Sequence, residues 1–379
     1  MSKHSGGGDG GRGRGRPKLF HPLCGADTLT LARLLARHGL PVRHAPELLI
    51  ALAVSVLRAP FSLAEHVVTL TERGRVGVKE APVFILGHWR SGTTHLYNVM
   101  SKADGFGFVS PFATALPWDF LLIGRLFAPL LKQALPEHRF IDNIPVEPDS
   151  PQEDEIGLAN MTPLSFYHGL YFPRRFAETF NAGVFFDGCT QDEIARWQRV
   201  LRYYFDKLSI GQGGRRLLIK NPVYTARVAL LRRMWPQAKF IHIHRNPYKV
   251  FVSMRNFYAQ LFSEFALAPY DHVDVDDFIL ATYRRMMDAY TKESASLPED
   301  QLVEISFEDF QKAPMTGLER IYGQLELPGF AEAEARFARY LDSVREYRKN
   351  TYSFPAEAKE RVSRHWQPYI ERWSYSPPA

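Results

Sequence analysis

The stretch that decides the fold is PVFILGHWRSGTT, residues 82–94. Its short apolar run ends at Gly87, and Gly92 precedes two threonines that suit the first turn of a helix. Glycines let the backbone approach an anion closely, and the N–H groups and dipole of a helix start then bind that anion. The stretch therefore predicts a buried strand, a phosphate-binding loop and a helix, in that order.

The loop departs from the common nucleotide-binding pattern at one position. Its spacing fits the template G-x-x-x-x-G-K-[ST], but Thr93 stands where the template has lysine. Arg90, inside the loop, is the nearest cation. The template lysine contacts the terminal phosphates of ATP. The sequence therefore favours a phosphate-bearing ligand other than ATP, with a nucleotide or small-molecule kinase as the alternative.

Short apolar runs alternate with helical patterns after residue 82. This alternation is typical of a parallel sheet that helices cover on both faces. Ligands of such sheets bind at the carboxyl ends of the strands, where Gly87, Lys220, Arg245 and Phe307 fall. The expected strands are 83–86, 216–219, 239–244 and 302–307, and the expected helices begin near residues 93, 224, 247 and 275.

The bulk composition narrows the class of protein. The chain has 379 residues, a net charge of +6 and two cysteines, Cys24 and Cys189. The charge suits anionic ligands, and the two cysteines match neither a metal site nor a disulfide framework, as is usual in a reducing compartment. The longest apolar run, 48–57, is shorter than the ~18 residues of a membrane span. We expect a helix of a soluble core there and, without a signal-peptide pattern, a cytoplasmic protein.

Composition also divides the chain. Residues 1–18 are rich in Gly and Arg, which predicts a disordered basic tail. The RGRP core of this tail resembles an AT-hook, so a DNA-binding protein is a further alternative, although nucleic acid is an unexpected partner. A helical segment is expected over 19–78 and the main domain over 79–379. Within that domain, 102–210 is rich in Phe, Leu and Pro and is expected to be a helical, acceptor-binding insertion.

Four strand-end signals occur in one order: RSGTT at 90–94, KNP at 220–222, Arg245 with Ser253, and FED at 307–309. In this order the chain resembles the sulfotransferases that use 3′-phosphoadenosine-5′-phosphosulfate (PAPS), and it is most similar to the bacterial branch whose loop reads P-R-S-G-T-T. The resemblance covers about residues 82–310. It implies a three-layer α/β fold with a central parallel sheet and a nucleotide-kinase-like phosphate loop, extended by added helices.

The resemblance also assigns a donor site. Arg90 would neutralise charge on the 5′-phosphosulfate, and Arg245 and Ser253 would hold the 3′-phosphate from two sides. Their eight-residue spacing suits this, because Ser253 lies about two helical turns beyond the strand end that carries Arg245. Phe307 occupies the position of a tyrosine that packs near adenine in the family. Arg364 is expected to take the role of the family's C-terminal basic loop. The remaining donor residues are Ser91, Gly92, Thr93 and Thr94.

Catalytic roles follow from the same resemblance. Lys220 matches the family's catalytic lysine, which stabilises the leaving phosphate or the transferring group. Asn221 and Pro222 follow it where cytosolic members have Thr-His with the general base, so the base must come from elsewhere. Glu153 and Glu155, in the acidic EDE cluster at 153–155, are the candidates. The alternative is that these acids only favour a helix start. Fallback bases are His88, His168 and Tyr167.

The expected reaction is in-line transfer of the sulfuryl group from PAPS to a hydroxyl or amine. Such a transfer requires alignment and charge stabilisation, and the resemblance implies no metal. The Phe- and Leu-rich middle section hints at an apolar acceptor such as a lipid, while a carbohydrate or another small molecule stays open. Peripheral contact with a membrane is compatible with such an acceptor, and the oligomeric state is left open.

Overall fold

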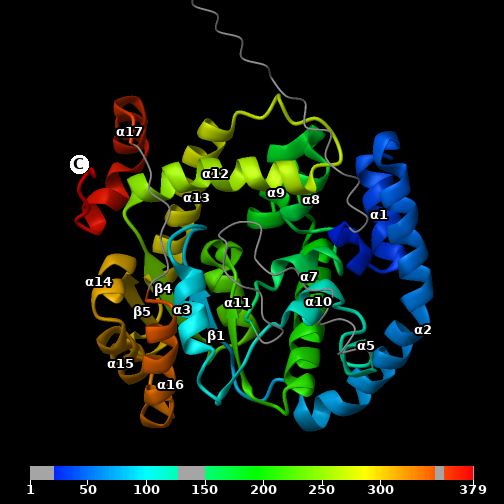
Figure 1. Ribbon diagram of the computed structural model, residues 1–379, viewed down its shortest axis with the longest axis horizontal. Coiled ribbons are helices and arrows are strands. Elements are labelled where there is room, and N and C mark those ends of the chain that lie inside the picture. Colours follow the sequence, from blue (N-terminus) through cyan, green and yellow to red (C-terminus); the bar gives the residue numbers. More distant parts are fainter. Residues whose placement is uncertain (1–20, 127–149, 346–353, 379) are drawn as a thin grey trace, which may run out of the picture.

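The computed structural model describes residues 21–126, 150–345 and 354–378 (Figure 1). The tail predicted over residues 1–18 lies outside the described residues. At the centre is a parallel sheet of five strands in the order β2-β3-β1-β4-β5. The strands are β1 (Val83–Leu86), β2 (Phe106–Gly107), β3 (Arg216–Lys220), β4 (Lys239–His244) and β5 (Leu302–Ser306).

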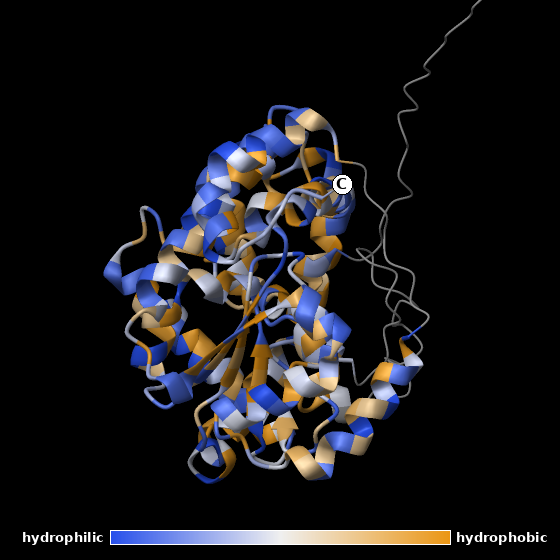
Figure 2. Ribbon diagram, turned by 90° about the vertical axis from the view of Figure 1, so that its left-hand side faces the viewer, coloured by the Kyte–Doolittle hydropathy of each residue, from blue (hydrophilic) through white to orange (hydrophobic). Residues whose placement is uncertain are grey.

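The central strand sends alternate side chains to opposite faces of the sheet. Val83 and Ile85 pack with α3 (Thr93–Met100), α15 (Pro314–Gln324) and α16 (Phe330–Ser343). Phe84 and Leu86 pack with α10 (Gln191–Gly211) and α11 (Val228–Met234) on the other face. Figure 2 shows the strands as an apolar centre between these helices. The predicted three-layer α/β fold with a parallel sheet is confirmed.

A third apolar cluster lies against the phosphate-binding loop and contains Trp89 from that loop. Its helices lie in the upper half of Figure 1. They are α8 (Tyr167–Tyr171), α9 (Phe176–Phe185), α12 (Pro247–Phe265), α13 (Val275–Ser294) and α17 (Ala356–Arg372), joined by α1 (Thr28–His38) from the N-terminal segment. The carboxyl end of β1 is therefore enclosed by helices rather than left open to water.

Shorter elements connect these layers. The short α-helices are α4 (Pro111–Ala115), α5 (Ile123–Leu126), α7 (Glu155–Ala159) and α14 (Phe307–Lys312). The 3-10 helices are η1 (Pro22–Gly25), η2 (Val42–His44), η3 (Pro173–Arg175), η4 (Pro222–Ala226) and η5 (Glu299–Gln301). Strand β2 lies in the middle section, which we predicted to consist of helices and loops. It was not predicted because two residues are too few to show the alternating pattern of a strand.

The helix expected over the apolar run 48–57 is present, but its expected burial in a core was wrong. The run belongs to α2 (Ala45–Val76), a helix along the outer edge of the molecule (Figure 1). Only Leu48, Ala51 and Ser55 of the run are buried, whereas Leu49 and Leu57 are 65% and 73% exposed. By length and composition alone α2 is also apolar enough to cross a membrane.

Candidate functional site

The phosphate-binding loop has a backbone that requires glycine at two points. Gly87 and Gly92 have φ values of +143° and +97°, and Arg90, at +68°, is one of four non-glycine residues with positive φ in the described part of the chain. A Cβ on Gly92 would lie 2.1 Å from Cδ2 of Phe307. The turn is closed by Ser91, whose N–H and hydroxyl both donate to the His88 carbonyl, at 3.1 and 2.7 Å. The loop then leads directly into α3, as predicted.

Arg90, Ser253 and Arg245 meet at this loop. The Nε of Arg90 donates to the Ser253 hydroxyl at 2.8 Å, and Nη1 of Arg245 donates to the Arg90 carbonyl at 3.0 Å. Ser253 is buried on α12, and Arg245 follows β4. The guanidinium groups of Arg90 and Arg245, which come from different elements, thus belong to one hydrogen-bonded cluster. Two neighbouring cations suit a ligand that carries more than one negative charge.

Phe307 closes one side of the loop. It is the first residue of α14, directly after β5, and its ring lies against Gly92. The Arg245 guanidinium stands 4.9 Å from the ring centroid. A flat apolar ring beside a cation and a phosphate-binding turn can stack on a base whose phosphates the loop holds.

Lys220 enters the site from the end of β3. Its ammonium group forms an ion pair with Glu153 and donates to the Thr94 hydroxyl at 3.3 Å. The Lys220 side chain is 1% exposed and that of Glu153 is 17% exposed. A buried cation is costly unless it is paired, so the ion pair with Glu153 compensates the burial of the Lys220 ammonium group beside the first turn of α3. The structure therefore brings Glu153, Lys220 and Thr94 together.

Glu155 lies deeper than Glu153. Its carboxylate accepts hydrogen bonds from the Ser165 hydroxyl and from Nδ2 of Asn221, both at 2.7 Å. The neighbouring Asp154 accepts from the same Asn221 amide at 2.8 Å and from the Tyr224 hydroxyl. Burial raises the pKa of Glu155 and raises that of Asp154 to about 8. Asn221 directly follows Lys220 in the chain. Its side-chain amide thus links both acids to the end of β3.

The fallback bases face away from open space. Burial lowers the pKa of His88 and of His168 to about 4. Both ring nitrogens of His168 lie at backbone carbonyls, those of Ala159 and Pro163. Tyr167 is 4% exposed. The Glu153 side chain, 17% exposed and paired with Lys220, is more accessible than any of these three side chains.

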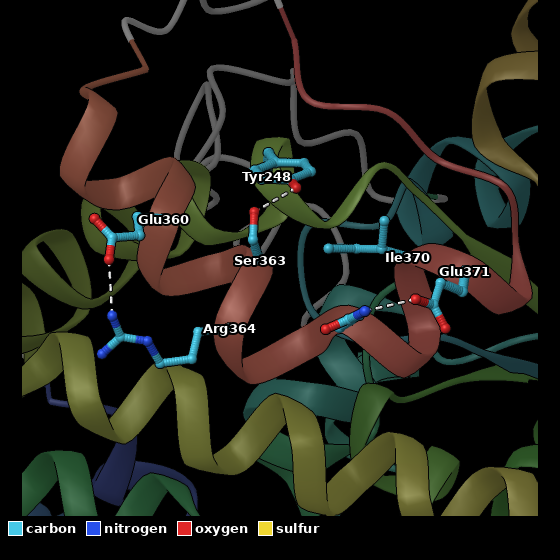
Figure 3. A pocket seen from close by; sticks show the side chains of 7 residues that line it. Tyr248, Glu360, Ser363, Arg364, Ile370 and Glu371 are labelled. Carbon is cyan, nitrogen blue, oxygen red and sulfur yellow. Dashed lines mark hydrogen bonds and ion pairs between the residues drawn. The ribbon is translucent and has the colours of Figure 1, made fainter.

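Arg364 lies apart from the loop. Its guanidinium pairs with Glu360 at 2.7 Å on the outer side of α17, and both side chains are 71% exposed. Figure 3 shows it at the rim of an open hollow of about 510 Å³ with Tyr248 and Ser363, whose hydroxyls lie 2.8 Å apart. No residue that lines this hollow belongs to the group around Arg90 and Lys220.

Three residues of the site were not predicted as such. Thr225 accepts the Gly87 N–H at 2.8 Å and so joins the loop to η4, while Asp154 and Asn221 form the buried acid network. Asp154 lies inside the quoted EDE cluster, so its acidity was visible but its burial was not. Nothing in the sequence signals Thr225. Among the described residues no group of three or more His, Cys, Asp or Glu side chains could hold a metal ion.

Comparisons with known proteins agree with this geometry. Residues 82–332 match the sequence profile of the sulfotransferase family. Two relatives, the omega-hydroxy-beta-dihydromenaquinone-9 sulfotransferases Stf3 of Mycobacterium bovis and Mycobacterium tuberculosis, are each 28% identical to this chain over 348 residues. These matches cover 90% of this chain and 88% of each relative.

Solved structures share the fold. Sulfotransferase STF9 from Mycobacterium avium superposes with a TM-score of 0.67 at 17% identity, over 93% of this chain and 97% of that one. Sulfotransferase STF1 from Mycobacterium tuberculosis H37Rv superposes with a TM-score of 0.64 at 16% identity, over 90% and 91%. The family match spans residues 82–94, the acidic cluster at 153–155, Lys220, Arg245 and Phe307. The chain is therefore a member of the sulfotransferase family.

Proposed function

We propose that the protein transfers the sulfuryl group of PAPS to the hydroxyl of a lipid-like acceptor. The observation that carries the proposal is the arrangement of three cations that lie at or just after the ends of different strands. Arg90 and Arg245 meet at the glycine-bounded turn, and Lys220 reaches the first turn of α3, which follows that turn directly. PAPS carries a phosphate group on the 3′ position and a phosphosulfate group on the 5′ position of its ribose. Two guanidinium groups, an ammonium group, the hydroxyls of Ser253 and Thr94 and an aromatic ring fit such a donor.

The acceptor is proposed to be an apolar molecule with a terminal hydroxyl, of the menaquinone class. Support comes from the relatives whose name gives an omega-hydroxy-beta-dihydromenaquinone-9 as the acceptor.

Glu153 and Lys220 are proposed to divide the chemistry. The acceptor oxygen attacks sulfur while the bond from sulfur to the bridging phosphate oxygen breaks, and the hydroxyl proton passes to the Glu153 carboxylate. Lys220 and Arg90 stabilise the negative charge that develops on the bridging oxygen. Glu155 holds Asn221 in position rather than taking the proton, because its oxygens already accept from Ser165 and Asn221.

The donor is tested by calorimetry with adenosine 3′,5′-bisphosphate and, separately, with ADP and Mg²⁺. We expect binding of the bisphosphate and at least about tenfold weaker binding of ADP, since a single charge-assisted phosphate contact contributes about 1.5–3 kcal/mol. Equal affinity for the two nucleotides, or turnover of ATP, would favour the kinase alternative instead.

The acceptor is tested with sulfur-labelled PAPS and two menaquinones that differ only in the terminal hydroxyl. Label should move to the hydroxylated compound and not to its deoxy partner. A panel of phenols, sterols and sugars serves as the comparison. Transfer of label to a sugar but to no isoprenoid would retain the sulfotransferase proposal and reject the acceptor class.

A further inference from the structure

The part of helix α2 between residues 49 and 70 has the reverse polarity of an ordinary surface helix. Its two charged side chains point inward, where Arg58 pairs with Asp119 at 2.8 Å and Glu65 pairs with Lys207 at 2.7 Å. Lys207 and Glu65 are 0% exposed. A helix that faces water on one side normally carries its charged residues on that side. The outer face of α2 lacks them, so this face is poorly suited to contact with water.

The outer face is apolar along most of the helix. Between residues 49 and 70 it exposes no Asp, Glu, Lys or Arg. Of the eleven large apolar side chains exposed among the described residues, ten lie between Leu29 and Leu70. We name the following residues the α2 outer face: Leu49, Leu52, Val56, Leu57, Leu63, Val67 and Leu70. Apolar patches of this extent mark a surface that binds something.

Basic side chains flank the N-terminal end of this face. Arg33, Arg37 and Arg43 are exposed, and residues 28–46 contain no Asp or Glu. Leu40 and Val42, between these arginines, are 58% and 76% exposed. The sequence before α1 adds the Arg-rich stretch GRGRGRPK at 11–18. Exposed cations beside exposed leucines are complementary to a surface that is apolar inside and anionic at its boundary.

We propose that the α2 outer face docks on a lipid membrane with the helix lying in the plane of the interface. Residues 49–70 would reach about 33 Å at 1.5 Å per residue, long enough to span a bilayer core. The helix is held flat, however, because the Arg58–Asp119 and Glu65–Lys207 pairs join its inner side to the protein and α10 packs along it. A helix tied in this way can insert its outer side chains but cannot cross.

A lipid surface fits this face better than a second copy of the chain. The helix bends around the outside of the molecule (Figure 1), with Pro60 inside it and hydroxyls of Ser62 and Thr69 bonded to carbonyls four residues earlier. Two copies of a convex helix would touch over a short segment only. The exposed arginines at one end would also repel their counterparts if two such ends approached each other.

The test is flotation of the full chain with two kinds of vesicle, phosphatidylcholine alone and phosphatidylcholine mixed with phosphatidylglycerol. The wild type should float with the mixed vesicles, and the triple variant Leu49→Gln, Leu57→Gln, Leu63→Gln should bind at least about tenfold more weakly. A second triple variant, Arg33→Gln, Arg37→Gln, Arg43→Gln, should lose the preference for anionic vesicles, by about fivefold per cation at low salt.

The matched control places the same three glutamines on a remote exposed helix, as Ala331→Gln, Ala335→Gln, Ala338→Gln on α16. It should float like the wild type. The proposal is overturned if the wild type stays in the soluble fraction with both vesicles, or if the leucine variant floats unchanged. Light scattering adds a third such outcome, namely a wild-type dimer that the leucine variant converts to a monomer. Donor binding is independent of α2, so these results and those for sulfuryl transfer can fail separately.

Discussion

The ammonium group of Lys220, 1% exposed at the end of β3, forms an ion pair with the carboxylate of Glu153. These two residues lie 67 positions apart in the chain. The pair puts the proposed general base beside the proposed stabiliser of the leaving group. The ion pair compensates the burial of the Lys220 ammonium group.

Glu153→Gln should lower kcat by about 10²-fold or more, the contribution typical of a general base. Its affinity for adenosine 3′,5′-bisphosphate should stay within about twofold to threefold, because Glu153 is assigned no donor contact. Steady-state kinetics and calorimetry measure the two quantities. Glu178→Gln, which alters an exposed carboxylate paired with Arg175, is the control and should change neither. A large loss of donor affinity in Glu153→Gln would contradict the assignment.

Arg245→Ala should weaken binding of adenosine 3′,5′-bisphosphate by about tenfold to hundredfold, because each hydrogen bond to a charged group contributes about 1.5–3 kcal/mol. Arg245→Lys should recover only part of this, since an ammonium group lacks the planar fork of a guanidinium. Calorimetry gives both affinities. Arg364→Ala is the informative comparison, because its guanidinium pairs with Glu360 away from the loop. We expect it to bind like the wild type, and a tenfold loss there would place Arg364 in the donor site after all.

Gly92→Ala should destabilise the protein and weaken donor binding. The new Cβ meets Phe307 at 2.1 Å, and alanine in the left-handed region adds about 1–2 kcal/mol of backbone strain. In a Phe307→Ala background, which lacks the ring, the further change Gly92→Ala should lower the thermal midpoint by less than it does in the wild type. Gly323→Ala is the matched control, since nothing lies within 4 Å of its added Cβ. A Gly92→Ala protein as stable as the control would refute the close packing described here.

The sheet and its ligand edge could be predicted because their signals are local. Four strand ends carry Gly87, Lys220, Arg245 and Phe307, and parallel strands bring their carboxyl ends together. The environment of α2 could not be predicted in this way. Its apolar run is as apolar as a core helix, and only tertiary contacts reveal that Arg58 and Glu65 take the inner face. The burial of Asp154 was equally hidden, because it depends on Tyr224 and Asn221, about 70 residues away.

The Glu65–Lys207 pair should be strongly coupled. Burial lowers the pKa of Lys207 to about 8 and raises that of Glu65. Lys207→Met leaves a buried carboxylate without its partner and should reduce the free energy of unfolding by about 3–5 kcal/mol. The double variant Glu65→Leu, Lys207→Met removes both charges and should be more stable than the single variant. Urea denaturation measures both, and a double variant less stable than Lys207→Met would contradict this account.

Asp154 should give the protein a distinct dependence of stability on pH. Burial raises the pKa of its carboxyl in the folded protein to about 8, from an ordinary 3.8. Between these values the folded chain keeps a proton that the unfolded chain releases, so the stabilisation is fully present below about pH 4 and is lost as pH rises towards 8. The free energy of unfolding of the wild type should therefore fall relative to that of Asp154→Asn across this interval. Glu65, whose pKa depends on Lys207 and not on Asp154, titrates alike in both proteins and cancels in the difference. Glu155 shares Asn221 with Asp154 and its charge raises the pKa of Asp154, so the difference reports the pair of acids. Denaturation curves at several pH values measure it, and parallel curves would show that Asp154 is ionised in the folded protein.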